Sequence, residues 1–302
     1  MALYAFNGTW NSEKTEDVAT EVLEHELNTN VKKFCDAYIG DGTFYTNGVG
    51  TRVGVLGKII GGAFGVGGQH RLADAVEHLQ KRLAAGDKTI DVVGFSRGAA
   101  LALAFTNRVH KHVTDPSTGK PPVIRFLGLW DVVGSFGFPI NLGPLKFQEY
   151  NLGYSLDLCA IVQHCYHAMA LDERRQTFRV TRLKGALELW FRGAHSDVGG
   201  GNGNLGLNNI ALCWMLKKAL ASGLPIDQSK MLAAETGRNP AATVKWPKDL
   251  IKQGYRTLSP EDRYHYTVTR SADRTLNDPP DGFLIEDAVA ELRSTVSQAF
   301  TV

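Results

Sequence analysis

The chain has 302 residues and a mass of 33.0 kDa, with 43% hydrophobic and 21% charged residues. It is long enough to bury a core without disulfide or metal cross-links, and its composition excludes disordered, collagen-like and disulfide-scaffold proteins. The 33 Lys and Arg residues nearly balance the 31 Asp and Glu residues, which argues against a protein that follows nucleic-acid phosphates along a basic face.

The first half of the chain predicts strands that alternate with helices. Apolar runs predict strands over residues 3–6, 31–38 and 89–95, and helical spacing predicts helices over 15–27, 71–85 and 97–112. The stretch 48–69 is rich in glycine, which disfavours a helix. We expect this stretch to form an apolar, adaptable loop near a functional site.

The second half continues the same alternation. Strands are predicted over 123–133 and 186–191, helices over 156–174, 207–222 and 284–299, and a loop over 134–150. Such alternation implies right-handed crossovers between parallel strands. We therefore expect an α/β fold, a mostly parallel sheet with helices on both faces, in a single domain over residues 1–302.

The N-terminus and the cysteines bear on the cellular compartment. The chain begins without the basic and apolar segments of a signal peptide, and no window of about 18 apolar residues predicts a membrane span. We expect synthesis in the cytoplasm, and export by a secretion system that reads no N-terminal signal stays open. The four cysteines form no C-x-x-C pair and are expected to be buried thiols.

A G-x-S-x-G motif, Gly94–Gly98, lies between the predicted strand at 89–95 and the predicted helix at 97–112. Such a turn holds its serine in a strained conformation, and glycine two residues before and after the serine avoids collisions. Ser96 is therefore a candidate nucleophile. The backbone N–H of Arg97 would face the site from a helix N-terminus, which favours developing negative charge.

A serine nucleophile needs a base and an acid that orients the base, and in this fold they follow the serine at later strand ends. The run Phe126–Asp131 ends in a carboxylate, and Leu187–His195 ends in a histidine. We expect His195 to take the hydroxyl proton of Ser96. Asp131 would hold the imidazole tautomer and stabilise its charged form.

Other residues compete for these roles. Asp197 is an alternative acid, although its position in a turn favours a structural role, and His265 is the rival base. A second oxyanion donor usually comes from the loop after an early strand. In this chain that donor would be the backbone N–H of Gly8 or Thr9.

A metal site is the weaker interpretation of one further cluster. His164 and His167 would share a face of the helix predicted over 156–174, near Asp172 and Glu173. No third ligand follows at a spacing typical of metal sites. We expect no metal and no other cofactor.

Six motifs together resemble one protein family. They run from about residue 3 to 225 and comprise Phe6–Asn11, Gly48–Thr51, Gly94–Ala99, Leu129–Val133, Ala170–Arg175 and Gly193–Gly201. The chain resembles an uncharacterised α/β-hydrolase domain family, whose best-known members are phospholipase effectors of bacterial type VI secretion. The resemblance implies an α/β-hydrolase fold with a triad of Ser96, Asp131 and His195. Asn7 departs from the family, which usually has Asp there.

We therefore expect a serine esterase or lipase that cleaves esters of lipids or lipid-like molecules through an acyl-enzyme. From the length of 302 residues we expect no membrane-anchoring region like that of the large effectors, and we therefore expect ester hydrolysis more firmly than phospholipid as the substrate. One alternative is an antibacterial phospholipase A, which implies membrane-surface contact and an immunity protein. The other is a catalytically silent scaffold used for binding, and thioesters or peptides also fit triad chemistry. Residues 48–69 and 134–150 are the candidate lid or pocket loops.

Overall fold

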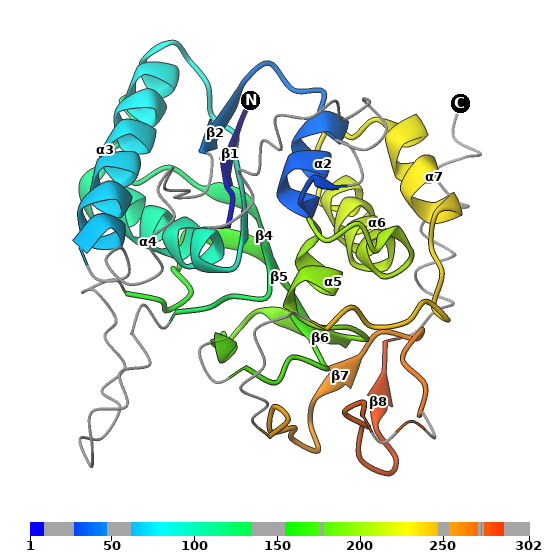
Figure 1. Cartoon of the computed structure of the whole chain (residues 1–302). Coiled ribbons are helices and arrows are strands. Elements are labelled where there is room, and N and C mark those ends of the chain that lie inside the picture. The colour runs from blue at the N-terminus through cyan, green and yellow to red at the C-terminus, as the bar shows by residue number, and fades with distance from the viewer. Residues whose placement is uncertain are drawn as a thin grey trace, which may run out of the picture.

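The computed structural model describes residues 1–8, 27–46, 62–134, 155–175, 178–246, 254–270, 273 and 275–286, with the side chains of 62–66 outside this set. In this part of the chain eight strands form one sheet, in the order β2-β1-β3-β4-β5-β6-β7-β8 (Figure 1). Every neighbouring pair is parallel. The strands are β1 (Ala2–Phe6), β2 (Thr43–Thr46), β3 (Ile90–Phe95), β4 (Ile124–Trp130), β5 (Val162–Ala170), β6 (Leu187–Phe191), β7 (Arg263–Tyr264) and β8 (Leu284–Ile285).

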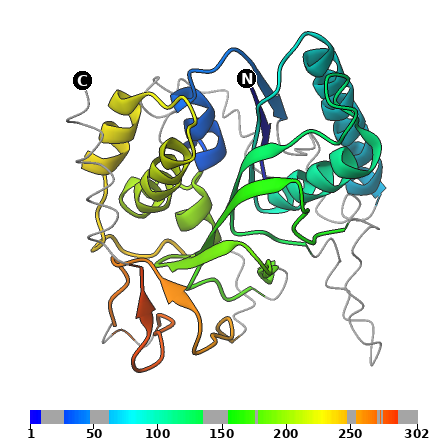
Figure 2. The same cartoon turned by 180° about the vertical axis from the view of Figure 1, so that it is seen from behind.

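Helices cover both faces of the sheet, as Figures 1 and 2 show from opposite sides. One face carries α3 (Gly62–Ala84) and α4 (Arg97–His112), and the other carries α2 (Asn30–Ala37), α5 (His195–Gly199), α6 (Leu205–Ala221) and α7 (Gln228–Thr236). Strand side chains alternate between the two cores, so Tyr4 and Phe6 join one and Leu3 and Ala5 the other. The α/β-hydrolase-like arrangement predicted from the sequence is confirmed, whereas the division into domains stays a prediction.

Two predicted elements have the wrong type. The helix expected over 156–174 contains β5 instead, which lies between β4 and β6. Its side chains alternate with period two: Ala168 and Ala170 face one core, and Cys165 faces the other. The strand expected over 31–38 is α2, whose first turn is capped by the Thr29 side chain accepting the N–H of Lys32.

Two further expectations change in part. Residues 62–69, expected to belong to a glycine-rich loop, form the start of α3, because extending the strong helix that follows is easier than nucleating a new one. Leu284–Ile285, expected to begin a closing helix, form β8. The predictions for residues 15–26, 48–61, 135–150 and 287–299 lie outside the described residues.

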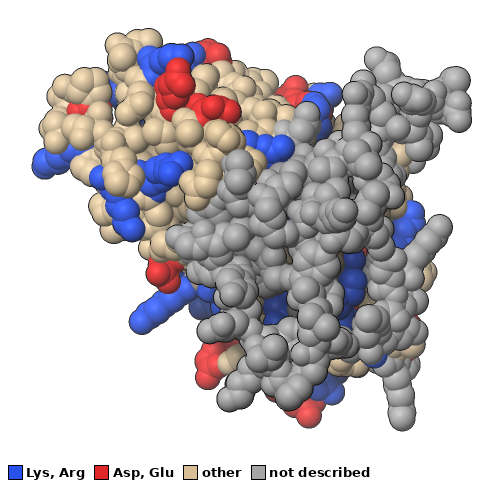
Figure 3. All heavy atoms as spheres, turned by 60° about the vertical axis from the view of Figure 1, so that its left-hand side comes forward, with Lys and Arg blue, Asp and Glu red and all other residues tan. Residues whose placement is uncertain are grey.

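Charges of both signs lie on the part of the surface that Figure 3 shows for the described residues. On the face drawn in Figure 3, Lys and Arg side chains are interspersed with Asp and Glu. This distribution agrees with a net charge of +2. Among the described residues, no helix combines the length and the apolar character needed to cross a membrane.

Candidate active site

Ser96 lies in the turn between β3 and α4, with φ 59° and ψ −127°. In the described part of the chain, the non-glycine residues with positive φ are Ser96 and Asp131, at 59° and 43°. Such conformations cost about 1–3 kcal/mol and persist only where the surroundings enforce them. Both strained residues are among those that the sequence predicted for the site.

The glycines of the G-x-S-x-G motif allow the backbone to pack closely around Ser96. A Cβ at Gly98 would lie 2.3 Å from the carbonyl oxygen of Phe6, and one at Gly94 would lie 2.6 Å from Cα of Ala99. Real Cβ atoms do not approach backbone this closely, so both positions require glycine. The end of β1 and the start of α4 are thereby held beside the serine.

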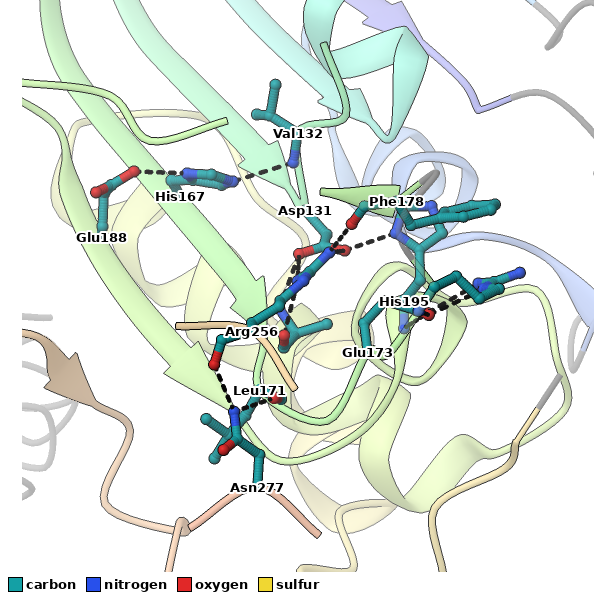
Figure 4. A network of polar contacts seen from close by, with 12 residues as sticks. Asp131, Val132, His167, Leu171, Glu173, Phe178, Glu188, His195, Arg256 and Asn277 are labelled. Atoms are coloured by element: carbon teal, nitrogen blue, oxygen red, sulfur yellow. Dashed lines mark hydrogen bonds and ion pairs between the residues drawn. The ribbon is translucent and has the colours of Figure 1, made fainter. Parts of the chain in front are cut away.

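His195 contacts Asp131 directly. His195 is the first residue of α5, and its Nδ1 lies 2.6 Å from Oδ2 of Asp131, the residue that follows β4 (Figure 4). An ionised carboxylate only accepts hydrogen bonds, so Nδ1 is the donor. The imidazole lies 4.6 Å, between ring centroids, from Phe95, the residue before Ser96. The N–H of Val133 donates to the carbonyl of Ser96 at 3.3 Å, and so links the serine turn to the loop that holds Asp131.

The Asp131 carboxylate is fully buried and receives hydrogen bonds at both oxygens. Oδ1 accepts the N–H of Ala170 at 2.9 Å and Nη1 of Arg256 at 2.6 Å, and Oδ2 accepts Nη2 of Arg256 at 2.9 Å beside His195. Burial alone would raise the pKa of Asp131, but Arg256 and His195 outweigh it and hold this pKa well below its usual range. Asp131 is therefore ionised at neutral pH. No sequence pattern had pointed to Arg256.

Glu173 and Phe178 support His195 from the loop that follows β5. Glu173 Oε2 accepts the backbone N–H of His195 at 3.1 Å and is paired with Arg175 at 2.8 Å. The Arg175 guanidinium stacks over Phe178, whose ring meets the imidazole edge-on at 4.8 Å. Burial lowers the pKa of His195, and the nearby carboxylates of Asp131 and Glu173 oppose this only in part. The imidazole is therefore neutral at neutral pH.

The competing acid and base lie elsewhere. Asp197 accepts the backbone N–H of Ala194 and of Lys245, which fits the structural turn role that we expected for it. His265 follows β7, where its ring stacks on Phe191 at 4.8 Å and its Nδ1 lies 2.8 Å from the hydroxyl of Thr267. Of the two candidate bases, His195 is the one that contacts Asp131.

The candidate oxyanion donors have different surroundings. Arg97 is the first residue of α4, directly after Ser96, where a helix favours negative charge. Gly8 also lies beside Ser96, because a Cβ at Gly8 would be 3.3 Å from the Ser96 Cβ. However, the Gly8 N–H donates a hydrogen bond to Oδ1 of Asn7 at 2.8 Å, and this hydrogen bond must break before the N–H can bind an oxyanion. Thr9 lies outside the described residues.

The histidines considered for a metal site lie on a strand, which overturns the helical geometry expected for them. His167 is buried, its Nδ1 donates to Glu188 at 2.9 Å, and its Nε2 accepts the N–H of Val132 at 3.1 Å (Figure 4). It therefore supports the backbone next to Asp131. Within the described ranges, no group of three or more His, Cys, Asp or Glu residues is placed to hold a metal ion.

The sequence matches the catalytic domain of the Tle1-like phospholipase effectors of the type VI secretion system (T6SS) over residues 3–112 and 103–218. The chain belongs to this family. Ser96, Asp131 and His195 of the Tle1-like domain fall within the matched residues, and Arg256 lies beyond them.

Two solved structures are similar to this Tle1-like domain. An uncharacterised protein from Pseudomonas aeruginosa has a TM-score of 0.52 and 21% identity, covering 79% of this chain and 48% of its own. The Tle1 effector bound to the VgrG spike of the type 6 secretion system has a TM-score of 0.46 and 22% identity, covering 68% of this chain and 51% of its own. The chain thus spans about half the length of these two proteins. The first similarity supports the fold alone, and no curated protein sequence matches the chain.

Proposed function

We propose that this Tle1-like domain is a serine hydrolase that cleaves carboxylic esters of lipids through an acyl-enzyme. The observation that carries the proposal is the buried contact of 2.6 Å between His195 and Asp131, next to a strained Ser96 at the end of β3. Family membership supports lipid hydrolysis as the reaction class. The alternative is a non-enzymatic scaffold, in which Ser96 would not react with a fluorophosphonate probe.

The neutral imidazole of His195 takes the proton of the Ser96 hydroxyl as its oxygen attacks the ester carbonyl. Asp131 keeps the Nδ1–H tautomer in place and stabilises the imidazolium that forms. The N–H of Arg97 stabilises the oxyanion at the start of α4. His195 then donates its proton to the leaving alcohol, and it later activates the water that releases the carboxylic acid from Ser96.

The Ser96→Ala variant tests the nucleophile. We expect wild-type protein to react with a fluorophosphonate probe and to hydrolyse p-nitrophenyl esters. The variant should lose labelling and at least about 10⁴-fold in turnover, because it lacks the hydroxyl that forms the acyl-enzyme. Ser229→Ala, at an exposed serine of α7, is the matched control and should behave as wild type. Unchanged turnover in Ser96→Ala would refute the assignment, and an inert wild-type protein would favour the silent scaffold.

Phospholipid is the substrate that family membership favours. We expect the protein to release free fatty acid from phosphatidylethanolamine or phosphatidylglycerol vesicles more efficiently than it hydrolyses short soluble esters. The reverse preference would indicate a simple esterase. The same membership supports export by a type VI system and an immunity protein in the producing cell as further parts of the proposal.

The pH dependence of the reaction should report His195. Because burial lowers the pKa of this histidine from 6.5, its base form persists below that pH, and kcat/KM should begin to fall only as the pH drops beneath 6.5. The pKa of Asp131 is lower still, so its protonation should not limit the rate in this range. A profile of kcat/KM from about pH 4.5 to 9 measures the pH at which kcat/KM has fallen to half of its plateau value, the midpoint. A midpoint well above 6.5 would contradict a buried, neutral His195.

A further inference from the structure

Arg256 belongs to none of the sequence motifs that predicted the site and lies beyond the residues matched to the family. Its guanidinium nevertheless forms a two-point ion pair with Asp131, with Nη1–Oδ1 at 2.6 Å and Nη2–Oδ2 at 2.9 Å (Figure 4). The same nitrogens donate to the backbone carbonyls of Ala170 and Phe178. The pair is buried, since 8% of the Arg256 side chain and none of the Asp131 side chain is exposed.

Asn277 holds the backbone of Arg256 in place. Its side-chain amide donates to the carbonyl of Arg256 and to that of Leu171, both at 3.1 Å. Its own N–H donates to Asp172 at 2.8 Å, just after β5. These hydrogen bonds of Asn277 therefore hold the segment around Arg256 against the loop that also contains Glu173.

The two-point pair has a geometric and an electrostatic effect on Asp131. A guanidinium fork fixes the plane of a carboxylate, and here the fixed plane leaves Oδ2 directed at His195. The positive charge of Arg256 also reduces the electrostatic stabilisation that Asp131 gives to the protonated imidazole of His195. Among the described residues, Glu173 and Arg175 also act on the imidazole, and they pair with each other. Asp197 on α5 accepts the backbone N–H of Ala194 in its own turn.

We propose that Arg256 is a positioning residue for the reaction, which acts through Asp131 to orient His195 and to keep the imidazole uncharged. This inference rests on the proposed function. It assigns a part of the chain outside the family match to the machinery of the active site.

The test compares Arg256→Gln and Arg256→Lys with the same substitutions at Arg125. Arg125 also forms a two-point ion pair with a buried carboxylate, that of Asp91, with Nε–Oδ1 at 3.0 Å and Nη2–Oδ2 at 2.7 Å. Asp91 lies at the start of β3, so this pair is at the opposite end of the strand from Ser96. Arg256→Gln should lower kcat about 10- to 100-fold. It should also raise the midpoint of the acid limb, the fall of kcat/KM at low pH, by about one pH unit. Arg256→Lys keeps the charge but loses the fork, so kcat should fall about 10-fold with the acid limb near its wild-type position. The Arg125 variants should lose thermal stability with kcat and the acid limb unchanged.

Arg256 variants that match their Arg125 counterparts in kcat and pH profile would overturn the inference. If Arg256→Gln does not fold, kcat of Arg256→Lys against Arg125→Lys decides the question alone. Fluorophosphonate labelling separates this result from the proposed function. A labelled wild type with Arg256 variants that match their Arg125 counterparts overturns only the role of Arg256, and a wild type that is not labelled at Ser96 overturns both.

Discussion

Replacing Asp131 with asparagine is expected to lower kcat by about 10³–10⁴-fold. An amide cannot stabilise the imidazolium of His195, and its NH₂ group favours the wrong imidazole tautomer. The variant also leaves Arg256 buried without its anionic partner, so we expect a loss of about 3–5 kcal/mol in the free energy of unfolding. Turnover of a p-nitrophenyl ester, measured below the melting temperature of the variant, separates the chemical effect from the loss of folded protein.

Asp91→Asn provides the matched control for this variant. Asp91 is also fully buried and also held by an arginine fork, from Arg125. We expect a similar loss of stability with turnover near the wild-type value, because Asp91 lies at the start of β3 and Ser96 follows its end. Equal losses of turnover in the two variants would show that activity follows stability alone and would contradict the role proposed for Asp131.

Four of the eight described strands, β1, β3, β4 and β6, could be predicted, because each is a short apolar run followed by a polar residue. For β3, β4 and β6 this pattern located Ser96, Asp131 and His195, and parallel strands bring such ends to one edge of a sheet. The pattern failed for β5, where alanine and histidine interrupt the β-branched residues expected of a central strand. The wrong helix there also misplaced His167, whose contact with Val132 depends on strand geometry.

The supporting residues could not be predicted in the same way, because their contacts depend on the tertiary fold. Arg256 and Asp131 are separated by 125 residues, and no local spacing relates them. Glu173 lies within the motif Ala170–Arg175, which carries part of the family resemblance. Its hydrogen bond from the N–H of His195 joins the ends of two strands, and the motif alone does not predict this contact. Sequence motifs thus identified the candidate reacting groups and Glu173, whereas Arg256, whose charge lowers the pKa of Asp131, lies in a segment without a motif.

Replacing Gly98 with alanine is expected to destabilise the protein by about 3 kcal/mol and to reduce turnover in the remaining folded fraction. The new Cβ would lie 2.3 Å from the carbonyl oxygen of Phe6 and 2.5 Å from that of Asn7. Both atoms belong to the backbone at the end of β1, which pairs with β2 and β3 and cannot rotate away as a side chain would. Relief of the collision must therefore separate β1 from α4 and displace Ser96, which directly precedes α4.

Gly67→Ala in α3 is the control, because nothing lies within 4 Å of a Cβ built there. Gly67 and Gly98 both lie in helices, where alanine is intrinsically favoured over glycine by about 1 kcal/mol. The control should therefore gain up to that amount in stability, measured by denaturant unfolding, while Gly98→Ala loses stability. If the change in the free energy of unfolding has opposite signs at the two positions, the loss at Gly98 comes from the collision with β1 and not from helix propensity. A Gly98→Ala variant as stable as Gly67→Ala would contradict the close contact between α4 and β1 on which the position of Ser96 depends.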